Sequence, residues 1–404
     1  MLTFFTRWLT PPRLRYAWIT AGVLWVAWLL SVALGPGNLD LAGQPVGTDY
    51  LQFYAAGRTL ACGESARLYD MAYQAALEKE IIGPGLTSYH AFITPPFLAW
   101  LFVPLAALPY GLSFAVWSVL GLVFLWCSLR LLGVAAPARA WLWALTFFPV
   151  FAVISFGQNA LLSLLLFSVA YRLWTARRPF LAGLACSLTL YKPQLCLGVT
   201  LLWLINWRRD WRVLVGLGVG GVALAASCFL LLPEASWAYV DFARTVLPDL
   251  PNWQEFPLWH LHTVRGFWRL LLPAWPRLGD GLTLIAAGFG VWGFVRWERR
   301  FREKLPLVFG GAMALTFWLT PHAMIYDWAL LLILALALWE TLPQNRDRWR
   351  PLFAVLWLVA LLSGPLTVMQ LRLLPVAVQV SVPFLAWALY QIWRWSLRGE
   401  LLPA

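Results

Sequence analysis

The chain of 404 residues is 61% hydrophobic and only 12% charged, whereas a soluble globular protein carries about 25% charged residues. Such a chain cannot cover its surface with polar groups in water, so the composition excludes an ordinary soluble protein and predicts an integral membrane protein. The net charge of +12 does not indicate a nucleic-acid partner, because the basic residues lie in short clusters between apolar runs. The 28 tryptophans suit aromatic belts at the two membrane interfaces.

The apolar runs, taken in chain order, predict an all-α, polytopic transmembrane helical bundle of about 12 spans. The first run is expected to be a retained helix, because no small-residue cleavage site follows it. Several runs are shorter than the roughly 20 residues of a straight span, which favours helices that tilt, break or dip around a cavity. The expected spans are 16–34, 110–132, 140–155, 158–174, 179–191, 194–206, 212–232, 281–296, 305–320, 326–342, 351–364 and 371–393.

The distribution of charge predicts the orientation of these spans. If the proline-rich segment 92–108 dips into the membrane without crossing it, one side carries 21 Lys and Arg with 6 acids, and the other carries 9 with 12. An excess of Lys and Arg marks the cytoplasmic side. We therefore expect a single membrane domain, 1–404, in the plasma (inner) membrane with both termini cytoplasmic. The expected outer segments are the loop 35–109, with 92–108 as a re-entrant or interfacial helix, the loop 233–280, and short turns at 157–159, 191–194, 321–327 and 364–370.

The positions of acidic, cysteine and histidine residues narrow the function classes. Every acidic residue lies in a loop or near a span end, whereas ion-coupled transporters place carboxylates near the midplane. The five cysteines form no disulfide framework, and no Cys or His spacing matches a metal site. We therefore expect neither a metal nor another cofactor.

The first outer loop contains the strongest candidate for a catalytic carboxylate. Asp49 begins a helix-like stretch that ends near Gly63, and a base at this position would lie at the membrane surface. The pattern Asp49-x-x-Gln52 is also that of a capping box, in which the aspartate would be structural. Asp70 is expected to cap the next helix. Asp40, close to the end of the first span, is the alternative base.

A candidate anion site lies in the turn at 191–194. Lys192 is followed by Pro193, and proline is common at the first position of a helix. That helix would begin at the outer face, so its positive dipole end and the lysine ammonium would together favour a phosphate. The alternative is a lysine that only extends toward water and binds no ligand.

Two other outer turns carry polar side chains. Gln158 and Asn159 could bind sugar hydroxyls, or they could cap the helices on either side. His322 and Asp327 lie more than one helical turn apart, so a contact between them is possible but not required. In the second outer loop, the segment 257–269 brings two histidines and two arginines among tryptophans, and an interfacial amphipathic helix is the simpler interpretation.

Taken in order, these motifs resemble glycosyltransferase family 87, whose members are integral membrane enzymes of the GT-C class and include polyprenyl-phosphate-mannose-dependent α-mannosyltransferases. The resemblance runs through the first half of the chain and weakly to PHAMIYD at 321–327, while the second outer loop matches little. The matching residues are Asp49, Tyr50, Phe53, Tyr54 and Gly57, then Pro95 and Pro96, then Gly157, Gln158 and Asn159, then Lys192 and Pro193.

The resemblance implies a reaction. A sugar, mannose in the family members named, would pass from a polyprenyl-phosphate donor to a glycolipid or glycan acceptor at the extracytoplasmic face, with inversion and with membrane lipid as the surroundings. It implies that Asp49 is the general base. The residues expected to bind substrate are Tyr50, Tyr54, Gln158, Asn159, Lys192, His322 and Asp327.

Three alternatives remain open at this stage. A lipid-linked-sugar flippase or polysaccharide transporter would need paired halves, which the sequence does not show. A non-catalytic membrane scaffold would not depend on Asp49 or Lys192. A ligase-like transferase that moves a whole glycan would differ only in the size of its donor.

Overall fold

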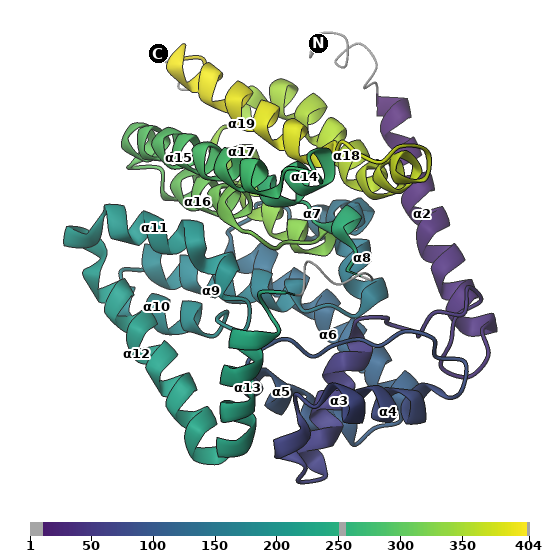
Figure 1. The fold of residues 1–404 in the computed structure, drawn as a ribbon. Helices are drawn as coiled ribbons and strands as arrows, with labels where there is room; N and C mark the ends of the chain where they lie inside the picture. The colour runs from purple at the N-terminus through teal and green to yellow at the C-terminus, as the bar shows by residue number, and fades with distance from the viewer. Residues whose placement is uncertain (1–10, 250–255, 402–404) are drawn as a thin grey trace.

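The computed structural model describes residues 11–249 and 256–401, and within these ranges every regular element is a helix, with two isolated β-bridges besides (Figure 1). The prediction of an all-α protein is therefore confirmed. Five described helices are long and apolar enough to cross a membrane. They are α2 (Pro11–Leu34), α6 (Tyr110–Leu131), α12 (Trp207–Leu231), α15 (Pro276–Phe301) and α18 (Arg346–Leu373).

Shorter helices fill the space between the long ones. α7 (Pro137–Thr146) and α8 (Phe148–Phe156) would make a sixth span, but they are bent by 76° where the sequence predicts one run, 140–155. Proline occupies the first position of several of these helices, where its missing N–H costs no hydrogen bond. The others are α9 (Ala160–Thr175), α10 (Pro179–Ser187), η2 (Pro193–Cys196), α11 (Leu197–Ile205), α16 (Leu305–Leu319), η5 (Ile325–Leu331), α17 (Leu332–Thr341), η6 (Pro343–Asn345) and α19 (Ser381–Leu397).

The prediction of a turn at 364–370 is wrong. α18 continues through this segment, with Pro365 inside the helix, and the chain turns at 374–380 instead. The glycine–proline pair at 364–365 favours a break on sequence grounds, but a membrane helix tolerates proline when its surroundings satisfy the freed backbone groups. The predicted spans 351–364 and 371–393 are therefore replaced by α18 and α19.

The two long loops are mostly helical. The first holds α3 (Tyr50–Ala61), η1 (Ser65–Arg67), α4 (Met71–Ile82) and α5 (Pro96–Ala106), and the second holds α13 (Pro233–Thr245), η4 (Leu258–His260) and α14 (Val264–Leu271). With 11 residues, α5 is about 16 Å long and too short for a hydrocarbon core of about 30 Å.

The first and second loops pack against each other at the lower end of Figure 1, where α13 lies near α3 and α5. The Tyr69 ring lies 5.3 Å from that of Tyr239, and the Ser65 hydroxyl donates to Glu234 at 3.4 Å. A third contact reaches the turn before η5, where the backbone N–H of His262 donates to the carbonyl of Ala323 at 2.9 Å. Both loops are therefore fixed to the helical bundle and to each other.

Two hydrophobic cores hold the bundle together. The larger lies among α8, α9, α11, α16, α17 and η5, and includes the fully buried Trp203 and Trp328. The smaller joins α3 to α5 and α6, with Tyr50, Phe53 and Phe102 at its centre. α2 belongs to neither core for most of its length, because only 6% of its apolar window is buried. In Figure 1 it stands along one edge of the bundle, the position of a lipid-facing helix.

α10 and α12 approach each other closely enough to exclude side chains. A Cβ at Gly183 would lie 2.0 Å from the carbonyl oxygen of Val213, and one at Gly216 would lie 2.1 Å from that of Phe180. Small residues are the usual means of close helix packing in membranes. The contact fixes α10, and α10 leads directly into the turn that carries Lys192.

Candidate active site

Asp49 stands at the start of α3 but does not cap that helix. Its backbone is helical (φ −83°, ψ −14°), and its side chain accepts no hydrogen bond from the first turn. A capping residue normally has an extended backbone. Asp70 shows the difference, because at φ −76° and ψ 103° it accepts hydrogen bonds from the N–H groups of Ala72 and Tyr73. The expected cap at Asp70 is therefore confirmed, and the capping box expected from Asp49 and Gln52 is wrong.

The Asp49 carboxylate is held instead from the turn between α8 and α9. Gln158 Nε2 donates to Asp49 Oδ2 at 2.8 Å, and the Asp49 backbone N–H donates to the carbonyl of Phe156 at 2.9 Å. Gly157 permits this close approach, because its φ is +70° and a Cβ there would lie 2.4 Å from Cβ of Tyr50. The turn and the start of α3 therefore fit together, although Asp49 and Gln158 are 109 residues apart.

Gln158 connects Asp49 to Lys192. The Lys192 ammonium, in the turn between α10 and η2, donates to Gln158 Oε1 at 3.3 Å and to Asp327 Oδ1 at 2.9 Å. The two bonds of Gln158 fix the orientation of its amide, because the reversed amide would place a donor against the lysine and an acceptor against the carboxylate. Pro193 follows at the first helical position, as predicted.

Asp327 ends this series of contacts at the start of η5. Its Oδ2 accepts the backbone N–H of Met324 at 3.0 Å, so both oxygens are bonded. Only 3% of the Asp327 side chain and 12% of the Lys192 side chain are exposed, which makes them a buried ion pair. Lys192 Nζ also lies 4.9 Å from the centre of the Tyr326 ring. We call the hydrogen-bonded set the polar row: Asp49, Gln158, Lys192 and Asp327.

The electrostatics of the polar row favour a basic carboxylate at Asp49. Burial raises the pKa of Asp49 above its ordinary value, while the hydrogen bond from Gln158 and the positive charge of Lys192 act in the opposite direction. A carboxylate with a raised pKa is a stronger base than an ordinary aspartate. Asp49 retains partial exposure, and among the described residues none donates a hydrogen bond to its Oδ1. One oxygen is therefore held while the other can accept a proton.

Asp40, the alternative base, closes a local turn. Its Oδ1 accepts the backbone N–H groups of Ala42 and Gln44 at 2.8 and 2.9 Å. Its side-chain hydrogen bonds lie within the first loop, 35–109, and none joins it to the polar row.

Tyr50 and Tyr54, both expected to bind sugar, lie in the smaller core. Tyr50 is fully buried, with its hydroxyl 2.5 Å from Ser113 Oγ, and the Tyr54 hydroxyl donates to the carbonyl of Leu108 at 2.8 Å. Their hydroxyls are thus satisfied within the protein. In this structure the two rings support the start of α3, on which Asp49 depends.

Asn159 and His322 lie beside the polar row, and the backbone N–H of Asn159 donates to Gln158 Oε1 at 3.4 Å. Asn159 is fully buried, and its side-chain amide finds no partner among the described residues, so it does not cap α9. Burial lowers the pKa of His322, and the charges of Asp327 and Lys192 both act on its ring. Burial therefore disfavours the charged form of the His322 ring.

Sequence reasoning left His260 and His262 without a role. The amphipathic helix in this region, α14, begins only at Val264, and the histidines precede it. His260 lies 6.0 Å from the Tyr326 ring, its Nδ1 is 3.1 Å from the Met324 sulfur, and burial lowers its pKa to about 4. The only sequence signal for this placement is the pair of histidines in an apolar stretch.

Glu78 and His90 form a second unexpected contact in the first loop. Glu78 is fully buried and accepts the backbone N–H of His90 at 2.9 Å, with the His90 ring Nδ1 3.8 Å from the carboxylate. Burial raises the pKa of Glu78, and a positive charge on His90 would lower that of Asp49. No motif in the sequence connects these residues. Among the described residues, no group of His, Cys, Asp and Glu could hold a metal ion.

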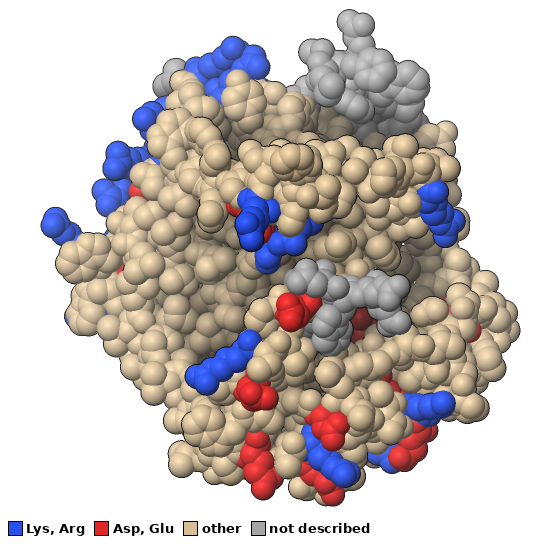
Figure 2. Space-filling model, viewed as in Figure 1, with Lys and Arg blue, Asp and Glu red and all other residues tan. Residues whose placement is uncertain are grey.

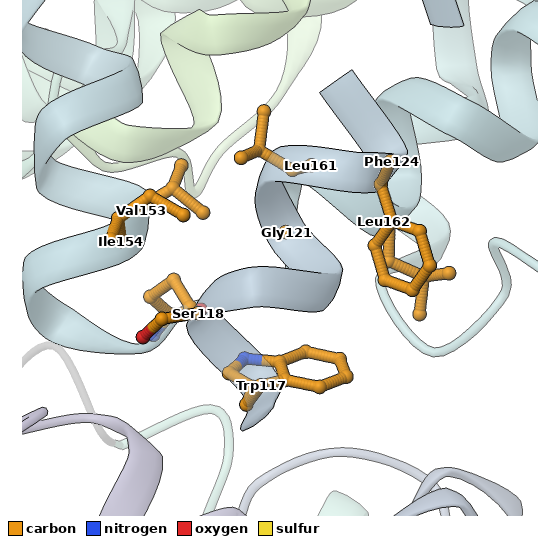
Figure 3. A pocket seen from close by; sticks show the side chains of 9 residues that line it. Trp117, Ser118, Gly121, Phe124, Val153, Ile154, Leu161 and Leu162 are labelled. Atoms are coloured by element: carbon orange, nitrogen blue, oxygen red, sulfur yellow. The ribbon is translucent and has the colours of Figure 1, made fainter. Parts of the chain in front are cut away.

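A small cavity borders Gln158 between α6, which carries Ser118 and Gly121, and α8, which carries Val153 (Figure 3). Its volume of about 10 Å³ suffices for one water and is far too small for a sugar. The Ser118 hydroxyl is buried there without a partner among the described residues.

Comparison with known proteins identifies the family. The sequence profile of glycosyltransferase family 87 matches residues 92–307, which is more than half of the chain and includes Gln158 and Lys192 but neither Asp49 nor Asp327. Searches of curated proteins and of solved structures returned no match. The chain belongs to glycosyltransferase family 87.

Proposed function

We propose that this membrane glycosyltransferase moves a hexose, mannose, from a polyprenyl-phosphate donor to a glycolipid or glycan acceptor at the extracytoplasmic face, with inversion at the anomeric carbon. Family membership supports the reaction class. The donor and the sugar follow from the resemblance of the first-loop motif around Asp49. No cofactor enters the proposed reaction.

The geometry of Asp49 carries the proposal. An aspartate that begins a helix usually serves that helix as a cap, and Asp49 does not. Its carboxylate is turned toward Gln158, which in turn is bonded to Lys192. Asp49 is thus a partly exposed carboxylate with a raised pKa, and one glutamine amide connects it to a lysine. A general base beside an anion site requires this arrangement.

The proposed chemistry is a single displacement. An acceptor hydroxyl oxygen attacks the anomeric carbon and transfers its proton to Asp49 Oδ1. The bond between the anomeric carbon and the phosphate oxygen breaks, and the electron pair leaves with the polyprenyl phosphate. Because the nucleophile approaches opposite the leaving group, a β-linked donor gives an α-linked product. Phosphate is a good leaving group, so the step needs no strong general acid.

Lys192 is the proposed ligand of the donor phosphate. An ammonium has three N–H donors, and Gln158 and Asp327 use two of them. The third is left for a phosphate oxygen. The donor adds one negative charge to a row that already holds two carboxylates, and an added anion raises the pKa of a nearby histidine.

The charge distribution supports an extracytoplasmic site. In Figure 2 the Lys and Arg side chains gather along the upper left of the molecule, near the C-terminal end of α19, while the acidic side chains lie mainly in the lower half, around α3, α4 and α13. The basic end is the expected cytoplasmic side. We propose that both termini are cytoplasmic, that loops 35–109 and 233–280 lie outside, and that 1–404 forms one domain of the plasma membrane.

The test is a transfer assay with purified protein in liposomes. The donor is polyprenyl phosphate carrying radiolabelled mannose, and the liposomes contain the lipid extract of the host membrane as the source of acceptor. We expect Asp49→Asn to bind donor but to transfer label at least about 100-fold more slowly, since general-base catalysis contributes about 10²–10⁴-fold. Its stability should change little, because Asp49 makes no capping bond and an asparagine oxygen can still accept the hydrogen bond from Gln158.

Asp70→Asn is the matched control. It changes an aspartate at the start of the neighbouring helix α4, where asparagine caps equally well. Its transfer rate should equal that of the unmodified protein. Near-normal transfer by Asp49→Asn would remove Asp49 from the mechanism. Movement of the donor across the bilayer without labelled product would favour a flippase instead.

A further inference from the structure

We propose that this protein has a second lipid site, distinct from the polar row, which binds an anionic phospholipid in a groove between α15, α16 and α19. The groove encloses about 290 Å³ and is lined almost entirely by apolar side chains. Its walls include Phe289 and Trp292 on α15, Trp318 on α16, and Tyr390 and Trp393 on α19.

Glycines give the groove its depth. A Cβ at Gly290 would lie 2.2 Å from the Trp318 ring, and a Cβ at Gly311 would lie 2.6 Å from Trp297 Nε1. Each glycine therefore lets the indole ring of the neighbouring helix pack directly against its backbone. Gly293 also lines the groove, and a Cβ there would meet nothing within 4 Å. The space at Gly293 is thus open, and a larger side chain would occupy it.

The polar atoms of the two indoles do not point into this space. Trp297 Nε1 donates to the carbonyl of Leu307 at 3.0 Å, and Trp318 Nε1 donates to the carbonyl of Ala286 at 2.7 Å. With their N–H groups satisfied by backbone, the indoles offer only ring faces and edges to an occupant. The groove is therefore suited to hydrocarbon.

One end of the groove is positively charged. Arg296, Arg299 and Arg300 follow Trp292 on α15, and spacings of three and four residues place Arg296 on the same helix face as the other two. The Arg296 guanidinium lies 4.7 Å from the centre of the Trp292 ring, at the groove wall. Among the described residues, no carboxylate forms an ion pair with any of the three. These cations are free to bind a phosphate.

A hydrocarbon groove that ends at unpaired arginines matches a phospholipid with an anionic headgroup. The apolar walls of the groove suit part of an acyl chain, and the arginines beyond Trp292 suit the phosphate of its headgroup. In the orientation proposed above, the arginines face the cytoplasmic leaflet, whose anionic lipids bind basic pockets between membrane helices. The site is thus at the opposite end of the membrane from the proposed donor phosphate.

The test is native mass spectrometry of the full chain in detergent, titrated with phosphatidylglycerol or with phosphatidylcholine. We expect phosphatidylglycerol to bind more tightly. Replacement of Arg296 by Gln should weaken its binding about fivefold, and Arg299→Gln and Arg300→Gln should act similarly. Binding of phosphatidylcholine, whose headgroup carries no net charge, should weaken less in these variants. Arg277→Gln, at the other end of α15, is the matched control.

A second variant tests the apolar part of the groove. Gly293→Leu should fill the space and weaken the binding of both lipids, while Gly288→Leu, on the same helix but outside the groove, should not. Equal binding of the two lipids by the unmodified protein would overturn the proposal. Unchanged lipid binding in Gly293→Leu would also overturn it. If the unmodified protein were a dimer and Gly293→Leu converted it to monomers, the occupant of the groove would be a second copy of the chain, and the proposal would be wrong.

Discussion

The ion pair between Lys192 and Asp327 gives the most exacting test of the polar row. The pair is 2.9 Å long, and its side chains are 12% and 3% exposed. Replacing Lys192 by Met keeps the length of the side chain but leaves Asp327 buried with only the Met324 N–H as partner. Removing one partner of a buried pair costs about 3–5 kcal/mol. Because Lys192 retains some contact with solvent, we expect about 3 kcal/mol.

A double-mutant cycle separates the charge pair from packing. Asp327→Asn alone should also destabilise the protein, because it leaves the ammonium without its carboxylate. The variant with both changes buries no unpaired charge, so the coupling free energy should reach about 2–3 kcal/mol. The free energy of unfolding is measured by titration with SDS in mixed micelles. Arg350→Met, which removes an exposed pair with Asp347, should cost less than about 1 kcal/mol.

The same variants separate stability from function. The double variant should regain stability but not activity, since it lacks the ammonium that is proposed to bind the donor phosphate. Lys192→Met should lower kcat/KM by a factor equivalent to about 1.5–3 kcal/mol of transition-state stabilisation. This is the contribution of a hydrogen bond to a charged group. A coupling energy near zero would show that the pair does not form in the protein. Normal donor kinetics in Lys192→Met would refute its role as phosphate ligand.

Three further predictions follow from single groups. Activity should fall as the pH drops through the pKa of Asp49, because the base must be ionised. Burial raises that pKa, so the midpoint of the pH–rate profile should lie above 3.8, and a lower midpoint would count against Asp49. Gly157→Ala should destabilise the protein at least about 2 kcal/mol more than Gly133→Ala, because both have φ near +70° but only Gly157 faces a neighbouring side chain. Cys62, exposed in the first loop, should react with a membrane-impermeant maleimide in intact cells, and protection until the cells are opened would reverse the proposed orientation.

Local rules account for the features that the sequence predicts correctly. Asp70 caps α4, Pro193 begins a helix, and α3 runs from Tyr50 to near Gly63, because each depends on the chemistry of a few adjacent residues. The all-helical fold follows from the apolar runs, because lipid forces backbone groups to bond within the helix. These signals are contained in the local sequence.

The remaining features depend on contacts between distant segments. The local sequence around Asp49 has a capping pattern, yet its carboxylate accepts a hydrogen bond from Gln158 instead. A rule based on neighbouring residues cannot predict this contact. The Gly-Pro pair at 364–365 has the composition of a turn, yet the helix continues through it. Tyr50 and Tyr54 are polar aromatics next to the candidate base, and only the position of α5 and α6 shows that their hydroxyls are used within the core.

The sequence separation within the polar row has a consequence for biosynthesis. Lys192 is synthesised 135 residues before Asp327, so the growing chain carries an ammonium without its carboxylate partner until η5 is in place. In the folded bundle only 12% of the Lys192 side chain is exposed, so an unpaired ammonium there is costly. A variant that lacks Asp327 would never complete this pairing. Its loss should therefore reduce the amount of protein that survives quality control in the membrane as well as the turnover of each molecule.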